Sequence, residues 1–220
     1  IATDKLPLPM DGRSVEVWNP YTSEMNLFVG NIDADGTTSF TLEPYGSRFI
    51  ILRPGNTTKS APVEYATVGR MPVEGTWSVM FPGIDTVTMD TLTSWTEFTN
   101  KDLKFFSGTA TYSIDFPVKK KMLKDTEARY VLSLGMVKNM AQVMVNGVTL
   151  PVLWKAPFEC DITDALVKGN NRIEVKVTNL WPNRMIGDEQ EPDDIEWSEP
   201  LKYDFAPGSP VAGRYMAKYP

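Results

Sequence analysis

Short apolar runs separated by turn-forming residues recur along the whole sequence. The chain has 220 residues, including 17 prolines and 15 glycines, and runs rich in Val, Thr, Ile and Phe lie between them. Such runs have the length of strands, and Pro and Gly mark the turns that join them. The pattern predicts an all-β chain, long enough to bury roughly 70% of the surface that its unfolded form exposes.

The N-terminal part predicts a small antiparallel sheet over residues 1–54. Residues 31–36, between two of its runs, include Asn, Asp and Gly, which tolerate positive φ in turns. We expect this segment to be the end of a β-sandwich that starts upstream. Residues 55–70 are polar and rich in turn formers, which predicts a linker. The four expected strands begin at Val15, Met25, Thr38 and Ser47.

A larger β unit is predicted over residues 71–205, followed by a tail over 206–220. Asn146 and Gly147 stand between two of its runs and form a strong hairpin signal, because both residues accept positive φ. At least six strands at regular spacing favour a sandwich or jelly roll. One helical turn is expected at 163–168, ended by Gly169, with Asp161 or Thr163 as its cap and Ile162 in the core. The strands are expected at 76–81, 108–116, 128–134, 140–145, 148–154 and 171–178.

An ordered series of short motifs runs through this larger unit. In chain order they are 112–116 (Tyr-Ser-Ile-Asp-Phe), 134–135 (Leu-Gly), 141–147 (Ala-Gln-Val-Met-Val-Asn-Gly), Trp154, 157–158 (Pro-Phe), 161–163 (Asp-Ile-Thr), Leu166, 169–170 (Gly-Asn) and 175–179 (Val-Lys-Val-Thr-Asn). The series resembles the sugar-binding domain of family 2 glycoside hydrolases. The resemblance implies a galactose-binding-like jelly-roll β-sandwich, preceded here by the small antiparallel segment.

Residues 179–188 (Asn-Leu-Trp-Pro-Asn-Arg-Met-Ile-Gly-Asp) carry a narrower resemblance. They are similar to the C-terminal region of large bacterial α-L-rhamnosidase-like hydrolases of family 106. In such enzymes the catalytic carboxylates lie on a separate upstream domain. The resemblance therefore implies that the partner of this chain is an upstream catalytic domain of the same polypeptide.

The absence of histidine limits the chemistry open to the chain. It removes the usual base of Ser and Cys nucleophile systems and the commonest metal ligand. Paired carboxylates, as in glycosidases, and oxygen-only metal sites remain. With 28 Asp and Glu residues, some pair will lie within about 5–10 Å by chance, so a pair alone indicates no catalysis. We expect no catalytic residue in this chain.

Charge and cysteine content exclude other classes. The net charge of −6 gives phosphate backbones little to bind, so nucleic acid is not an expected partner. No stretch approaches the ~20 apolar residues that a membrane-crossing helix needs. Cys160 is the single cysteine, and its acidic neighbours argue against a reactive thiol. We expect the chain, which starts at Ile1 without Met, to be either processed or cut from something larger. As a disulfide-free part of a bacterial hydrolase, it is expected in the periplasm, on the outer membrane or outside the cell.

The candidate binding residues gather after the last long strand. Two tryptophans beside loops could stack against a sugar ring, whereas Trp77 is expected in the core. The loop 179–196 holds amides and charged groups able to bind vicinal hydroxyls, but Arg184 and Asp188 could equally form a salt-bridged anchor or dock on the catalytic domain. The candidates for sugar binding or docking are Trp154, Asn179, Trp181, Asn183, Arg184, Asp188 and Glu189.

A structural calcium ion is a weaker hypothesis for the same loop. Calcium needs six to eight oxygen ligands, and the acidic run could supply some of them, although it lacks the spacing of an EF-hand. The candidate ligands are Asp188, Glu191, Asp193 and Asp194. A solvated acidic loop is the alternative, and no other cofactor is expected.

Three functions follow from these observations. The first is a non-catalytic accessory region that supports or borders the catalytic domain of a bacterial, polysaccharide-degrading glycoside hydrolase. The second is an autonomous carbohydrate-binding module with its site on the 179–196 loop. The third, a complete glycosidase, would require a carboxylate pair in a pocket of this chain.

Overall fold

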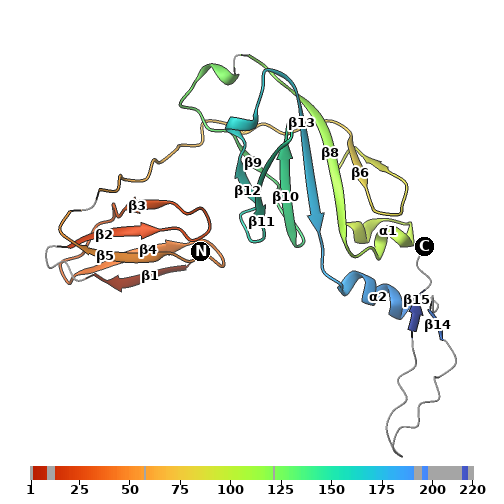
Figure 1. The fold of residues 1–220 in the computed structure, drawn as a ribbon, viewed down its shortest axis with the longest axis horizontal. Helices are drawn as coiled ribbons and strands as arrows, with labels where there is room; N and C mark the ends of the chain where they lie inside the picture. Colours follow the sequence, from red (N-terminus) through yellow and green to blue (C-terminus); the bar gives the residue numbers. More distant parts are fainter. Residues whose placement is uncertain are drawn as a thin grey trace, which may run out of the picture.

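In the computed structural model, residues 2–8, 13–56, 58–120, 122–190, 195–197 and 215–217 are described. Strands account for 39% of the chain and helices for 12%. The strands form several antiparallel sheets (Figure 1). The all-β prediction is therefore confirmed.

The N-terminal unit contains five strands in two sheets. Strand β1 pairs with β4, and β2 lies between β3 and β5. The rings of Phe28 and Phe40 stack at 5.2 Å, and Leu8, Val15 and Thr38 are buried, so the two sheets enclose a small core. We expected four strands in one sheet; the first strand escaped prediction because Asp4, Lys5 and Pro7 interrupt its apolar pattern. The strands are β1 (Ala2–Pro7), β2 (Arg13–Trp18), β3 (Met25–Leu27), β4 (Thr37–Leu42) and β5 (Phe49–Pro54).

The larger unit is built on a six-stranded antiparallel sheet with the order β11-β10-β13-β8-β6-β7. A second sheet joins β9 to β12. Asn146 and Gly147 have φ of 50° and 84°, which confirms the predicted hairpin between β10 and β11. The strands are β6 (Trp77–Met80), β7 (Val87–Met89), β8 (Thr109–Val118), β9 (Val131–Ser133), β10 (Met140–Val145), β11 (Val148–Leu153), β12 (Glu159–Asp161) and β13 (Gly169–Thr178).

Alternation along the strands places the core on one face of the six-stranded sheet. Every second residue of β8 from Ala110 to Val118 is buried, as the period of two in a strand requires. Leu132 and Cys160 of the second sheet pack against this cluster, so the core lies between the sheets of a β-sandwich. Trp77 and Ile162 are buried in the core, as predicted.

Helices are short and lie at the ends of the strands. The predicted turn at 163–168 is shorter in the structure, where η3 covers Thr163–Ala165. Asp161 Oδ1 accepts a hydrogen bond from the Thr163 amide at 2.8 Å, but the N-cap residue is Ile162, and Gly169 begins β13 and does not end the turn. The prediction of a loop over 179–196 is wrong for Pro182–Gln190, which form the helix α2. The helices are η1 (Trp95–Glu97), α1 (Lys101–Lys104), η2 (Met122–Lys124), η3 (Thr163–Ala165) and α2; a short pair, β14 (Ile195–Trp197) and β15 (Tyr215–Ala217), follows.

The connection between the two units has no regular structure where it is described. Strand β5 ends at Pro54, β6 begins at Trp77, and residues 58–74 form neither helix nor strand. The division into 1–54, 55–70, 71–205 and 206–220 stays a prediction. In the described part of the chain, no helix is long and apolar enough to span a membrane.

Candidate functional site

The turn that precedes β8 holds the N-terminal end of helix α2. Asn179 donates its side-chain amide to the Phe106 carbonyl at 2.8 Å and accepts from the Gly108 amide at 2.8 Å. Between these residues, Ser107 Oγ donates to the Leu180 carbonyl at 3.1 Å and accepts from the Arg184 amide at 3.0 Å. Ser107 thus caps a helix 77 residues away, and Asn179 serves the fold.

The inner face of α2 packs closely on the end of α1. Gly187 is buried, and a Cβ placed there would lie 2.7 Å from both Cβ and Cγ of Phe105. Asn183 donates to the Lys104 carbonyl at 3.4 Å. The predicted ion pair is also present, with Arg184 Nε 2.7 Å from Asp188 Oδ1 one turn along the helix. Asn183, Arg184 and Asp188 therefore hold the helix in place.

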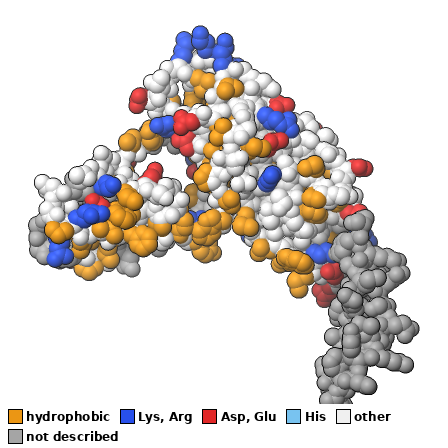
Figure 2. All heavy atoms as spheres, viewed as in Figure 1, with side chains coloured by type: hydrophobic (Ala, Val, Ile, Leu, Met, Phe, Trp, Pro, Cys, Tyr) orange, Lys and Arg blue, Asp and Glu red, His pale blue; other side chains and the backbone are white. Residues whose placement is uncertain are grey.

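The outer face of α2 is apolar and open. Trp181 is 76% exposed and Met185, four residues later on the same face, is 63% exposed. Leu180 and Ile186 are exposed beside them, and Glu189 is exposed at the end of the helix. Figure 2 shows hydrophobic side chains on the surface in the region that α2 occupies in Figure 1. We call Leu180, Trp181, Met185 and Ile186 the α2 strip; exposed apolar surface of this kind marks interaction sites.

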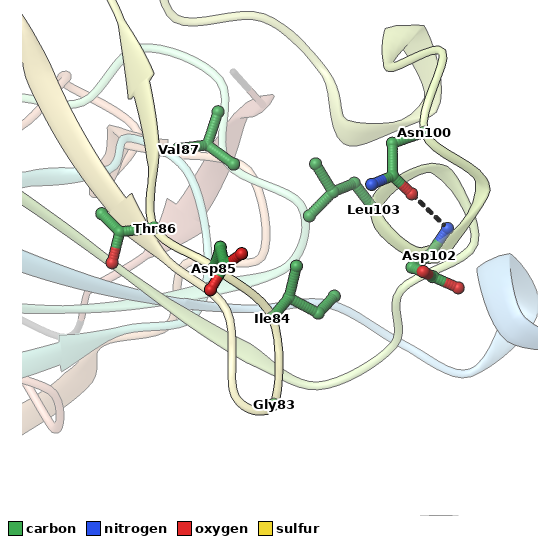
Figure 3. A pocket seen from close by; sticks show the side chains of 8 residues that line it. All are labelled: Gly83, Ile84, Asp85, Thr86, Val87, Asn100, Asp102 and Leu103. Carbon is green, nitrogen blue, oxygen red and sulfur yellow. Dashed lines mark hydrogen bonds between the residues drawn. The ribbon is translucent and has the colours of Figure 1, made fainter.

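A shallow hollow of about 520 Å³ lies on another side of α1 (Figure 3). Its floor is the buried Leu103, with the half-buried Ile84 and Val87 beside it. The carboxylates of Asp85 and Asp102 are exposed there and can accept hydrogen bonds from hydroxyl groups. Sequence reasoning missed these residues because Asp, Asn and Gly between strands predict only turns. The lining consists of Gly83, Ile84, Asp85, Thr86, Val87, Asn100, Asp102 and Leu103.

Trp154 belongs to a different place, where the two β units meet. It follows β11, and its ring lies 5.5 Å from that of Tyr21 in the N-terminal unit, at a tilt of 57°. The next residue, Lys155, places Nζ 4.3 Å from the centre of the Tyr21 ring and 2.9 Å from Glu43 Oε1. Arg48 binds both oxygens of Glu43 at 3.1 Å. The structure therefore separates Trp154 from the other six candidates, which gather on and beside α2.

The calcium hypothesis involves residues that the structure describes only in part. Asp188 is paired with Arg184. Glu191, Asp193 and Asp194 lie outside the described residues. Within the described ranges, no three His, Cys, Asp or Glu side chains are grouped so that they could hold a metal ion.

The sandwich and the motif series agree with a known family. Residues 66–202 match the family described as glycosyl hydrolases family 2, sugar binding domain. The chain belongs to this family. The resemblance to family 2 sugar-binding domains is thereby confirmed, and the match covers the whole six-stranded sheet and α2.

Two relatives place this family 2 sugar-binding domain within larger proteins. A protein of Formosa agariphila named as a β-glucuronidase is 38% identical over an alignment of 214 positions that covers 90% of this chain and 18% of that protein. The structure of a rhamnosidase from Novosphingobium sp. PP1Y superposes with a TM-score of 0.67 at 31% identity, covering 86% of this chain and 18% of that chain. The chain thus spans about a fifth of either relative.

The family assignment supports the first of the three functions, the non-catalytic accessory region. A family 2 sugar-binding domain is a non-catalytic part of a glycoside hydrolase, and the relatives are named as glycosidases. The prediction of a non-catalytic, carbohydrate-binding-like region of a glycoside hydrolase is therefore confirmed.

Proposed function

We propose that this chain is the accessory region of a bacterial glycosidase, and that it supports a catalytic domain in the same polypeptide through the α2 strip. The observation that carries the proposal is the family match over 66–202 on a sandwich with an open apolar helix face. The catalytic carboxylates of the enzyme belong to the remainder of the polypeptide. The chain supplies a rigid surface against which that remainder packs.

The two faces of α2 support this division of roles. The inner face is committed to the sandwich through Gly187 on Phe105 and through Asn183 on the Lys104 carbonyl. The outer face carries Trp181 and Met185, which are enriched at protein interfaces. Burying one such side chain stabilises a complex by roughly 1.5–3 kcal/mol. A helix anchored on one side and apolar on the other is suited to domain docking.

The parent enzyme is proposed in more detail from the relatives. The rhamnosidase structure, at 31% identity, supports an α-L-rhamnosidase-like hydrolase of family 106 with a jelly-roll domain at this position. Its substrate would be a polysaccharide, which is too large to enter a bacterial cell intact. Such an enzyme works in the periplasm, on the outer membrane or outside the cell.

The docking proposal is tested in the full-length enzyme with Trp181→Ser combined with Met185→Ser. Loss of two buried apolar contacts should lower the melting temperature of the enzyme and reduce kcat/KM, because the catalytic domain loses its support. Met136→Ser is the matched control, since Met136 is 86% exposed and lies outside α2. Equal melting temperatures and equal kcat/KM in the double variant and the control would refute docking through α2.

A further inference from the structure

We propose that Trp154 and Tyr21 form a saccharide-stacking subsite at the contact between the two β units. Its ligand is a pyranose ring that lays its C–H face on the indole. The inference rests on the proposed function as a sugar-binding region, and it adds where the sugar binds and which side chain it contacts. Sugar sites of this type combine a fixed aromatic ring with hydrogen-bonding groups at its edge.

One side of the Trp154 ring is fixed by packing. Tyr21 lies against it at 5.5 Å, and the Tyr21 hydroxyl donates to the Tyr45 carbonyl at 3.1 Å and accepts from Ser47 Oγ at 3.1 Å. Lys155 covers the Tyr21 ring and is itself held by Glu43 at 2.9 Å. The aromatic pair is therefore ordered before any ligand binds, which removes part of the entropic cost of binding.

The other side of the ring is open. Trp154 is 50% exposed, and its indole N–H donates to none of the described residues. Hydrophobic side chains reach the surface where the two units approach each other (Figure 2). A half-exposed indole whose N–H has no acceptor among the described residues offers a sugar both a stacking face and a donor for a hydroxyl oxygen.

Tyr45 lies in the loop between β4 and β5, and its backbone carbonyl accepts the hydrogen bond from the Tyr21 hydroxyl. It is 83% exposed, and its φ of 58° is in the left-handed region, which is uncommon for a residue with a side chain. Strained backbone of this kind is concentrated at functional sites, where the surrounding structure maintains it. Glycine would adopt this φ without strain.

Charge at the subsite permits a neutral or an anionic sugar. Glu43 is paired with both Lys155 and Arg48, which leaves a net charge of about +1 beside the aromatic pair. A cationic amino sugar would be disfavoured there. The hollow beside α1 is the competing location, but no aromatic ring lines it.

The test is a titration of the full 220-residue chain with L-rhamnose and with D-glucuronate, followed through the indole N–H resonances, with the Kd of each variant measured by calorimetry. Saturable shifts of the Trp154 resonance are expected with at least one sugar. Trp154→Ala should weaken binding about tenfold, because an aromatic contact contributes about 1 kcal/mol or more. Met136→Ala, which removes another exposed apolar side chain, should leave the Kd unchanged.

Two results would contradict the proposed subsite. If Trp154→Ala binds like the unaltered chain while Trp181→Ala or Asp85→Asn loses binding, the sugar site is elsewhere and the sugar-binding role stands. If neither sugar shifts any indole resonance, the subsite is wrong, whereas docking through α2 is decided separately by its own variants. If Trp154→Ala fails to fold, the titration of the unaltered chain decides the proposal by itself. The Trp154 resonance is then assigned by its absence from the spectrum of Trp154→Phe.

Discussion

Asn171 is fully buried at the start of β13, and both polar atoms of its side chain are hydrogen-bonded. Its Oδ1 accepts from the Val167 amide at 2.8 Å and from Asn146 Nδ2 at 2.7 Å, and its Nδ2 donates to the carbonyls of Val167 and Gly169. The sequence predicts a chain reversal at 169–171, and this prediction is wrong, because these residues are the first three of β13 and pair with β8. The burial of Asn171 follows from the two-residue period of the strand, because Asn171 lies on the same face of β13 as Ile173 and Val175.

Asn171→Ala should lower the free energy of unfolding by about 2–4 kcal/mol, because it leaves several buried partners without a hydrogen bond. Urea denaturation measures the change. Asn170→Ala, at the exposed neighbouring position, should stay within about 0.5 kcal/mol of the unaltered chain. Similar losses in the two variants would contradict the role of the buried amide.

Glu43 makes the contact between the β units dependent on pH. The hydrogen bond from Lys155, with help from Arg48, lowers its pKa from 4.5 to about 2. A carboxylate whose pKa falls on folding adds stability that is complete above the unfolded pKa and is lost as pH falls through the folded pKa. The stabilising effect of Glu43 should therefore decline between pH 4.5 and about 2.

The check is the difference in unfolding free energy between the unaltered chain and Glu43→Gln, measured by urea denaturation at several pH values. The difference should be greatest above pH 4.5 and shrink toward pH 2. A difference that stays constant over this range would contradict the lowered pKa. Sequence reasoning could not find this contact, because Glu43 and Lys155 are 112 residues apart.

At the scale of elements, the long strands of the larger unit were predictable, whereas β1 and α2 were not. Strands β8, β10 and β13 follow from their own alternating residues, and the hairpin before β11 follows from Asn146 and Gly147. Helix α2 depends on Ser107, a cap supplied from a distant part of the chain. Pro182 at its first position favours a helix start, and this signal could have been used.

Gly187→Ala tests how closely α2 packs on the sandwich. Alanine in place of glycine favours an isolated helix by about 1 kcal/mol, but its Cβ would lie 2.7 Å from Phe105. Because Cβ and Cγ of Phe105 cannot move freely, we expect net destabilisation of about 1–3 kcal/mol and a lower melting temperature. Glu189→Ala, at an exposed position, is the control. A higher melting temperature for Gly187→Ala would show that the helix can move away from Phe105.

At the scale of the whole molecule, the family was predictable from sequence, whereas the grouping of the candidate residues in space was not. The ordered motifs between 112 and 179 are mostly turns and core residues, and they specify the sandwich that the family shares. The binding candidates were grouped by their proximity in sequence. The structure divides them between α2 and the Tyr21–Trp154 contact, because these groups lie on different elements.

We propose that this non-catalytic sugar-binding region supports its enzyme by docking through α2. Hydrogen–deuterium exchange of Pro182–Gln190, compared between the 220-residue chain and the full-length enzyme, tests it most directly. We expect these amides to exchange at least about tenfold more slowly in the full-length enzyme, because docking suppresses the local opening of α2. Equal exchange rates in the two proteins would contradict it.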